Sequence, residues 1–379
     1  NQNEAIHIER NRIFGNGSSK CNGGITIDPG NPGTLIVNNL IYANGRNGVA
    51  FTGERHTERH DYGLKGKHDH DNKRKPDHDD EDEEDDEAGA GPRWLIGNTI
   101  HANAWNGVQV ARGHEVFLVN NVITQNGTAP RGDGGRFGLQ HRASAHFWLP
   151  WHARPARGVR LLHNLICGNR LGEINGPALD ATDANNLTPT GVEGPGVLAS
   201  PGCDITTNVY ASLSGPDGLA NTADDDFSLA VGSPAIDRGM DPRTLGLNPA
   251  FNPRLEADFA GEAARPKDGN GDGTAEFAMG ALEFNRDVTA PEVTFLGPQA
   301  NVFVRQTVTV RAEATDAGSG VNDVTLSADS QSLTTTLSPT PPASPVTATA
   351  SWNTTTFPDG TQTLTATATD VAGNTATAT

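Results

Sequence analysis

The chain is poor in aromatic residues, in cysteine, in basic residues and in long apolar runs. Aromatic residues make up 6% of its 379 residues, and 28 Lys and Arg stand against 46 Asp and Glu, giving a net charge of −18. A nucleic-acid partner is therefore excluded, because phosphate backbones are bound by clustered Lys and Arg. No apolar run is long enough to span a bilayer, so we expect no membrane insertion.

The three cysteines, Cys21, Cys167 and Cys203, show no CxxC spacing, which excludes a cysteine zinc site and a full disulfide framework. Cys21 and Cys167 would lie about four coils apart, on the order of 19 Å in the arrangement derived below, too far for a disulfide. Two alternatives stay open for Cys167, a disulfide with Cys203 or a buried free thiol.

The residues present in excess point to an all-β chain. Glycine occurs 44 times, and Asn and Thr are frequent, which suits turns and strands rather than helices. A pattern Asn-x-Ile-x-x-Asn recurs five times, and most copies are followed by Gly and alternating apolar residues. The copies are Asn11-Ile13-Asn16, Asn39-Ile41-Asn44, Asn98-Ile100-Asn103, Asn121-Ile123-Asn126 and Asn164-Ile166-Asn169.

The repeat predicts stacked coils. Asn tolerates the left-handed conformation of a sharp corner and can hydrogen-bond to the Asn above and below, while Ile points inward and stacks on Ile. One such unit cannot bury its apolar face alone, so the repeats must pile up around a continuous core. Residues 1–180 resemble the bacterial right-handed parallel β-helix repeat family, in the pectate-lyase-like superfamily that also includes alginate lyases. Their right-handedness is implied by that resemblance.

A charged segment interrupts the repeat. Asn98 and Asn121 are 23 residues apart, close to one coil, whereas Asn39 and Asn98 are 59 apart. The surplus matches residues 54–91, after which Arg93–Ile96 resumes the strand that Thr34–Val37 supplies one coil earlier. We expect a disordered, solvated loop whose deletion leaves the helix folded. The alternative is divalent-metal capture by its histidines, His56, His60, His68, His70 and His78.

Two further regions follow the coils. Residues 181–286 resemble the closing region of secreted bacterial β-helix proteins, which covers the last coil and its unpaired strand edges. The start of the chain lacks a comparable cap, so we expect the natural protein to continue upstream. Residues 287–379 alternate like the strands of a β-sandwich and resemble bacterial Ig-like modules. The expected fold is thus an all-β parallel β-helix solenoid followed by an Ig-like β-sandwich.

Alternation also assigns the exposed face of the coils. It places Thr26, Ala50, Gln109 and Gln140 in one outward column and Asp28, Thr52, Ala111 and Arg142 in the next. Neither column holds a carboxylate cluster or a lysine, and Asp28 and Arg142 are expected roughly 14 Å apart, too far for an acid/base pair on one bond. Candidate ligand-binding residues on this side are Gln109, Gln140, Arg142, Trp148 and Trp151.

Trp148 and Trp151 belong to the loop HFWLPWH at residues 146–152, which leaves the coil at the same corner as the charged segment. Exposed indoles offer flat apolar faces on which sugar rings stack. Alternatively, the two rings fold back and cover the side of the helix.

Calcium is the expected cofactor, if there is one. Asp268, Asn270, Asp272 and Gly273 have the spacing of the first half of a calcium loop, with Thr274 and Glu276 as further ligands. Position twelve is Met279, so Glu276 or Glu283 would have to replace the usual bidentate Glu. The alternative is a plain Gly-Asp turn. Residues 217–226 form a second, weaker candidate.

The resulting hypothesis is a secreted or cell-surface bacterial protein, expected to be a monomer, that recognises or adheres to polysaccharide. The alternative is a polysaccharide lyase or epimerase acting on acidic glycans, the chemistry that the pectate-lyase-like resemblance implies. The two differ in whether unsaturated uronate absorbance appears when the protein meets anionic polysaccharide.

Overall fold

The computed structural model describes residues 6–17, 23–28, 31–52, 91–111, 115–129, 135–141, 158–176, 183–191, 194–200, 203, 208–261 and 265–379. These residues form two compact units, 1–284 and 285–379, each with its own core. The boundary lies two residues before the position expected from the sequence. The charged segment, Cys21 and the Trp148/Trp151 loop lie outside the described residues.

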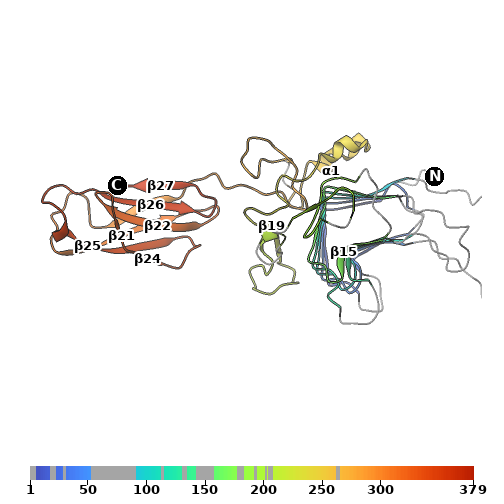
Figure 1. The fold of residues 1–379 in the computed structure, drawn as a ribbon, viewed down its shortest axis with the longest axis horizontal. Helices are drawn as coiled ribbons and strands as arrows, with labels where there is room; N and C mark the ends of the chain where they lie inside the picture. Colours follow the sequence, from blue (N-terminus) through green and yellow to red (C-terminus); the bar gives the residue numbers. More distant parts are fainter. Residues whose placement is uncertain are drawn as a thin grey trace, which may run out of the picture. The chain divides into compact units, whose positions relative to one another are not determined.

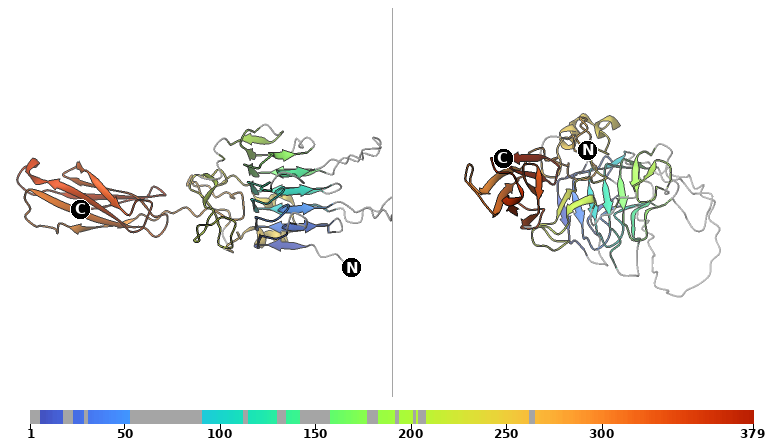
Figure 2. Two further views of the ribbon diagram at one scale, coloured as in Figure 1. Left: turned by 90° about the horizontal axis from the view of Figure 1, so that it is seen from below. Right: turned by 60° about the vertical axis from the view of Figure 1, so that its left-hand side comes forward.

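Unit 1 is a parallel β-helix in which five coils each contribute one strand to each of three sheets, so that each strand pairs with its counterpart one coil away (Figures 1 and 2). The second sheet continues for two further strands. Sheet A contains β1 (His7–Glu9), β4 (Leu35–Val37), β7 (Arg93–Ile96), β10 (Val116–Val119) and β13 (Val159–Leu162).

Sheets B and C complete the coils. Sheet B contains β2 (Arg12–Phe14), β5 (Leu40–Tyr42), β8 (Thr99–His101), β11 (Val122–Thr124), β14 (Leu165–Cys167), β16 (Asn186–Thr188) and β17 (Val197–Ala199). Sheet C contains β3 (Ile25–Ile27), β6 (Val49–Phe51), β9 (Val108–Val110), β12 (Phe137–His141) and β15 (Gly172–Asn175).

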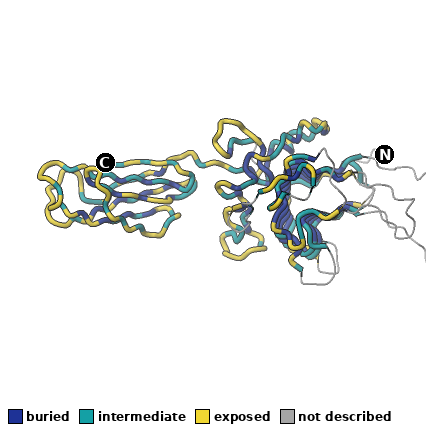
Figure 3. Tube along the Cα trace, viewed as in Figure 1, coloured by how far each residue is buried: buried dark blue, intermediate teal, exposed yellow. Residues whose placement is uncertain are grey.

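The register confirms the repeat. The central isoleucines pair in a column from Ile13 through Ile41, Ile100 and Ile123 to Ile166. The last four are fully buried. The interior of the coils is coloured dark blue, for buried, in Figure 3. Leu35 pairs with Trp94 and Val37 with Ile96, so the strand after the charged segment does resume the preceding coil.

Two asparagine ladders run along the corners of sheet B. In the first, each side-chain Nδ2 donates to the Oδ1 of the Asn one coil further on, at 2.9–3.1 Å, and the members are Asn11, Asn39, Asn98, Asn121, Asn164 and Asn186. The second runs at 2.9–3.1 Å through Asn16, Asn44, Asn103, Asn126 and Asn169. It ends where Asn169 donates to Glu173 Oε2 at 2.6 Å. The predicted stacking of Asn on Asn is confirmed.

The predicted reason for Asn at these corners is partly wrong. The left-handed conformation falls on the residue before each ladder Asn, for example Asn38 (φ 55°), Ala43 (φ 52°), Gln125 (φ 53°) and His163 (φ 53°). The ladder Asn itself is selected by hydrogen bonding, because its amide both donates to and accepts from neighbouring coils. A non-glycine residue in the left-handed region costs roughly 1–2 kcal/mol, which the ladder bonds must offset.

The closing region covers the outer faces of sheets A and B. It contains β18 (Tyr210–Ser212), β19 (Asp226–Leu229), the 3₁₀ turns η3 (Pro242–Leu245) and η4 (Pro249–Phe251), and one short helix, α1 (Asn252–Leu255). Leu247 and Leu255 pack against sheet A, whereas Tyr210 and Phe227 pack against sheet B. The region therefore covers the sides of the β-helix, which the expectation of a cover over the last coil did not include.

A buried arginine and a disulfide attach this cover. Arg265 donates from Nε to Glu283 at 2.6 Å and from Nη1 to the side chain of Asn38 at 2.7 Å. Cys167 of β14 is bonded to Cys203, with Cα atoms 6.4 Å apart, which decides between the two alternatives for Cys167.

Unit 2 is a sandwich of two antiparallel four-stranded sheets around a core of small and branched side chains (Figure 1). The first sheet has the order β20 (Glu292–Gly297), β21 (Thr307–Thr315), β25 (Val346–Asn353), β24 (Thr335–Ser338). The second has the order β23 (Gln331–Leu333), β22 (Val321–Ala328), β26 (Leu364–Asp370), β27 (Thr375–Ala378), and η5 (Thr354–Thr356) follows β25.

Replacing residues 54–91 by a short Gly-Ser link should leave unit 1 folded. The neighbouring coils join sheet C to sheet A through residues 28–34 and 111–115, so a link that restores five to seven residues between β6 and β7 is long enough. We expect the circular dichroism spectrum to be unchanged and the melting temperature to fall by no more than a few degrees. Loss of the β-sheet signal would contradict the continuity of the coils.

Asn121→Ala should destabilise unit 1 far more than Asn11→Ala. Asn121 is fully buried, and its Oδ1 accepts from both the backbone N and the Nδ2 of Asn98. The substitution leaves this buried backbone N unpaired, whereas Nδ2 keeps Ile36 O and Ile96 O as acceptors. A buried unsatisfied group costs about 1–3 kcal/mol and each further lost hydrogen bond about 1 kcal/mol, so we expect a loss of about 2–5 kcal/mol in denaturant unfolding. Asn11 is exposed at the ladder's end, where water replaces the lost bonds. Equal losses would show that the ladder does not stabilise through burial.

Acid should weaken unit 1 through His101. Burial lowers the pKa of His101 to about 4 from 6.5, and its Nδ1 lies 2.9 Å from Thr124 Oγ1 beneath the closing region. Between these pH values the unfolded chain binds more protons than the folded one, so this stability is complete above about pH 6.5 and declines as the pH falls towards 4. The difference amounts to about 3 kcal/mol. In urea unfolding, His101→Asn should flatten the pH dependence, and an unchanged slope would exclude His101 as its cause.

Candidate functional site

Sheet C is the sheet whose outward side chains are accessible. Strands β4 and β5 are buried at all three positions, because the closing region covers sheets A and B. Strands β3, β6 and β9 are buried at their first and third positions and half-exposed at the second. A ligand lying along the β-helix would therefore meet the outward columns of sheet C.

The register confirms the predicted columns. Thr26 pairs with Ala50, Ala50 with Gln109, and Gln109 with Gln140, so these four side chains follow one another across adjacent strands. In the next column Thr52 donates from Oγ1 to Asp28 Oδ1 at 2.9 Å. Arg142, Trp148 and Trp151, the other predicted binding residues, lie outside the described residues, so their role stays a prediction.

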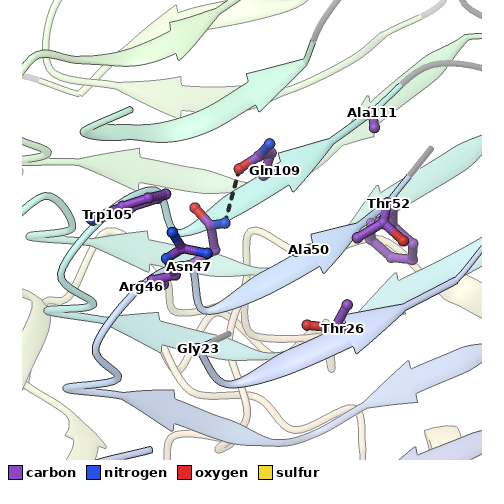
Figure 4. A pocket seen from close by; sticks show the side chains of 10 residues that line it. Gly23, Thr26, Arg46, Asn47, Ala50, Thr52, Trp105, Gln109 and Ala111 are labelled. Carbon is purple, nitrogen blue, oxygen red and sulfur yellow. Dashed lines mark hydrogen bonds between the residues drawn. The ribbon is translucent and has the colours of Figure 1, made fainter. Parts of the chain in front are cut away.

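A hollow of about 260 Å³ opens on this face (Figure 4). It exists because small residues occupy positions that longer side chains would fill, namely Gly23, Ala50 and Ala111. Its volume is below the 300–1,000 Å³ typical of pockets that enclose a small ligand. The hollow therefore suits one portion of an extended ligand that continues along the sheet.

Trp105 and Arg46 form one wall of the hollow. The Arg46 guanidinium carbon lies 4.2 Å from the centre of the Trp105 ring, and both side chains are half-buried (Figure 4). The two residues come from the turns between sheets B and C of adjacent coils, where Trp105 N donates to Arg46 O at 2.9 Å. Stacking of the turns thus places the cation over the indole face.

Arg46 has no anionic partner in the described part of the chain, and its Nε is buried without a hydrogen bond. Burying part of a guanidinium without a partner is costly, because the group loses hydration that nothing replaces. A carboxylate or hydroxyl oxygen of a ligand would supply the missing acceptor.

Amides line the floor beside this wall. Asn47 Nδ2 donates to Gln109 Oε1 at 2.8 Å (Figure 4). On the next coil, Asn106 Nδ2 donates to Gln140 Oε1 at 3.0 Å. These bonds fix both glutamine oxygens, so the glutamine Nε2 groups remain as donors. Neither Nε2 has a partner among the described residues. Two fixed donors on adjacent strands can bind successive hydroxyl or carboxylate oxygens of a polymer.

The described residues of the outward columns contain one carboxylate, Asp28, and no lysine. General acid/base cleavage needs a second ionisable group within reach of the same bond. The arrangement is thus suited to binding and, within the described residues, contains no catalytic pair.

Sequence reasoning missed Arg46, Asn47 and Trp105. A signal was present, because Asn44–Gly48 and Asn103–Gly107 share the pattern Asn-x-x-Asn-Gly. Aligning the two turns places Arg46 and Trp105 at the same position in adjacent coils, which is close enough for stacking.

The predicted calcium loop is held by its own hydrogen bonds. Asp268 accepts from the backbone N of Gly271, Asp272 and Gly273 at 2.7–3.1 Å, and Asp272 accepts from Thr274 N at 2.8 Å. Asn270 Nδ2 donates to Asp272 Oδ2 at 3.2 Å, and Glu276 lies opposite Lys267 in a β-bridge. Glu283 is occupied by Arg265, so it cannot act as the replacement ligand. Calcium binding by Asp268–Glu276 stays a prediction.

The weaker calcium candidate at residues 217–226 is also held by its own hydrogen bonds. Asp225 accepts from the backbone N of Asn221 and Thr222, and Asp217 accepts from Leu219 N. The side chains therefore cap their own turns.

Residues 291–366 match the family model of a bacterial Ig domain. This match covers most of unit 2 and agrees with its two antiparallel sheets. Bacterial Ig domains are common in extracellular and surface proteins. No curated protein matches the chain. Among the described residues, no helix has the length and apolar character needed to cross a membrane.

Proposed function

We propose that the outward face of sheet C binds a polysaccharide and that the protein serves recognition or adhesion at the bacterial cell surface or outside the cell. The observation that supports this most strongly is Arg46, whose buried Nε lacks a partner while its guanidinium lies on Trp105 beside an open hollow. An indole, a cation and fixed amide donors on one face are the groups that bind sugar rings, carboxylates and hydroxyls.

The shape of the face favours a polymer over a small molecule. The strands of sheet C are stacked along the helix, and strand neighbours lie about 4.8 Å apart, so the same face is presented coil after coil. A chain of sugars can contact Trp105 and Gln109 in one coil and Gln140 in the next. Arg46 further favours glycans that contain uronate, since a carboxylate gives a charge-assisted bond.

The Ig-like unit supports the proposed location. Residues 291–366 match a domain that is common in extracellular and surface proteins. The lyase or epimerase alternative, derived from the pectate-lyase-like resemblance, has no supporting acid/base pair among the described residues of sheet C.

Isothermal titration with alginate, polygalacturonate and dextran tests the proposal. Arg46→Gln should weaken binding of the two uronates by about 10- to 100-fold, the loss expected for a hydrogen bond to a charged group, and should spare any binding of dextran. Trp105→Ala should weaken every glycan that binds, by about tenfold, because it removes the stacking surface.

Arg311→Gln is the matched control, because Arg311 is exposed on β21 of the other unit and the charge change is identical. Wild-type affinity in both site variants, with their folding verified by circular dichroism, would reject this face as the binding surface. Unsaturated uronate absorbance in the wild-type samples would instead favour the lyase.

A further inference from the structure

Three aspartates that are distant in sequence meet at one end of the Ig-like unit. Asp287 precedes β20, Asp316 follows β21, and Asp370 is the last residue of β26. Each offers a carboxylate oxygen, and these three atoms lie within 4.8 Å of one another. Asp370 is fully buried, and Asp316 is 8% exposed. The cluster therefore places like charges together where water is scarce.

One oxygen of this cluster lacks a partner. Asp316 Oδ2 accepts from the backbone N of Gly318 and Gly320 at 3.1 and 2.6 Å, whereas Asp316 Oδ1 is buried without any hydrogen bond. A buried carboxylate oxygen without a donor is costly, and protein groups normally satisfy it. Here the neighbours that face it are two further carboxylates, which have no proton to donate.

Among the residues that the structure describes, no cation balances the cluster. Throughout residues 265–379, which the structure describes without a gap, none of the three aspartates forms an ion pair. The site thus combines oxygen donors with uncompensated negative charge.

The surrounding loops hold the carboxylates in position. Asp287 accepts from Thr289 N and Ser319 N at 2.9 and 2.7 Å. Asp370 accepts from the backbone N and from Nδ2 of Asn374, both at 2.8 Å. Gly318 is required by this packing, because a Cβ there would lie 2.3 Å from Asp287 Oδ2. Every carboxylate is therefore oriented before a ligand arrives.

We propose that Asp287, Asp316 and Asp370 bind one calcium ion. Ca²⁺ accepts six to eight oxygen ligands at about 2.3–2.6 Å, so two of its ligands can lie up to about 5 Å apart, and the three oxygens, all within 4.8 Å of one another, fit this range. Mg²⁺ demands shorter bonds of about 2.0–2.1 Å in strict octahedral geometry, and zinc prefers nitrogen and sulfur. Water can complete the calcium shell.

Calcium at this position would join three segments of the unit. Asp287 belongs to the segment that enters β20, and Asn374 Nδ2 donates to Asp287 O at 3.0 Å from the turn after β26. An ion shared by Asp287, Asp316 and Asp370 would fix that segment against both sheets of the sandwich. Chelation should consequently expose residues 285–291 to proteolysis.

Isothermal titration of the full chain with CaCl₂ tests the proposal. To separate this site from the loop at Asp268, all chains carry Asp268→Asn and Asp272→Asn. We expect one calcium ion to bind this background, and Asp316→Asn to weaken it on the order of 100-fold, because ligand charge sets the affinity of calcium sites. Asp359→Asn is the matched control, since Asp359 is exposed in the loop between β25 and β26.

Calorimetric unfolding with calcium and with chelator shows whether Asp316 is a calcium ligand or a residue that only stabilises the fold. Calcium at about 100 times its Kd should raise the melting temperature of the Ig-like unit by on the order of 10 °C, and Asp316→Asn should abolish this rise. With chelator the variant should melt no lower than its parent, because it keeps an acceptor for Gly318 and Gly320 and loses one repelling charge. Absence of calcium binding, or a variant equally destabilised under both conditions, would overturn the proposal.

Discussion

The β-helix depends on the buried side-chain amide of asparagine. A primary amide both donates and accepts, so a column of identical asparagines satisfies itself coil after coil, as in the run from Asn39 through Asn98 to Asn121. The same Oδ1 also accepts a hydrogen bond from a backbone N–H at the corner. For instance, Asn121 Oδ1 accepts from the backbone N of Asn98. Without these bonds the buried corners would contain unpaired backbone groups, which proteins rarely tolerate.

The ladders fix the spacing and register of everything attached to the coils. Because Asn44 and Asn103 are hydrogen-bonded at 2.9 Å, the residues that follow them keep the same offset, and Arg46 stacks on Trp105. The glutamines of sheet C are placed by the same register. The candidate binding surface is thus a consequence of the core, and the residues that differ between coils supply its chemistry.

Much of the fold could be predicted from the sequence, because its determinants are local and repeated. The Asn and Ile positions recur at short spacing, and Ile41, Ile100 and Ile123 are buried in one column as expected. The position of the left-handed residues could not be read this way. Some of these positions hold Asn or Gly, which favour the conformation, but Arg10, Ala43, Gln125 and His163 do not, and there only the geometry of the corner imposes it.

The candidate sites were harder to predict, because they join residues that the repeat does not relate. The closing region leaves sheet C accessible by covering sheets A and B, and this follows from contacts such as Arg265 with Asn38, 227 residues apart. Likewise, Asp287, Asp316 and Asp370 come from three separate segments of the Ig-like unit. Motif spacing instead pointed to Asp268–Glu276. There, carboxylates that cap short-range turns have the spacing of a calcium loop.

The two units differ in how their buried polar side chains are satisfied. The asparagine column is neutral and contains a donor for every acceptor, so it needs nothing from solution and can be extended by adding coils. A carboxylate has acceptors alone, so Asp287, Asp316 and Asp370 cannot satisfy one another, and each that is added increases the repulsion. In the site proposed above, a calcium ion supplies the balancing charge. On this reasoning, the β-helix should keep its stability when divalent ions are removed, whereas the order of the Ig-like unit's entry segment depends on the medium.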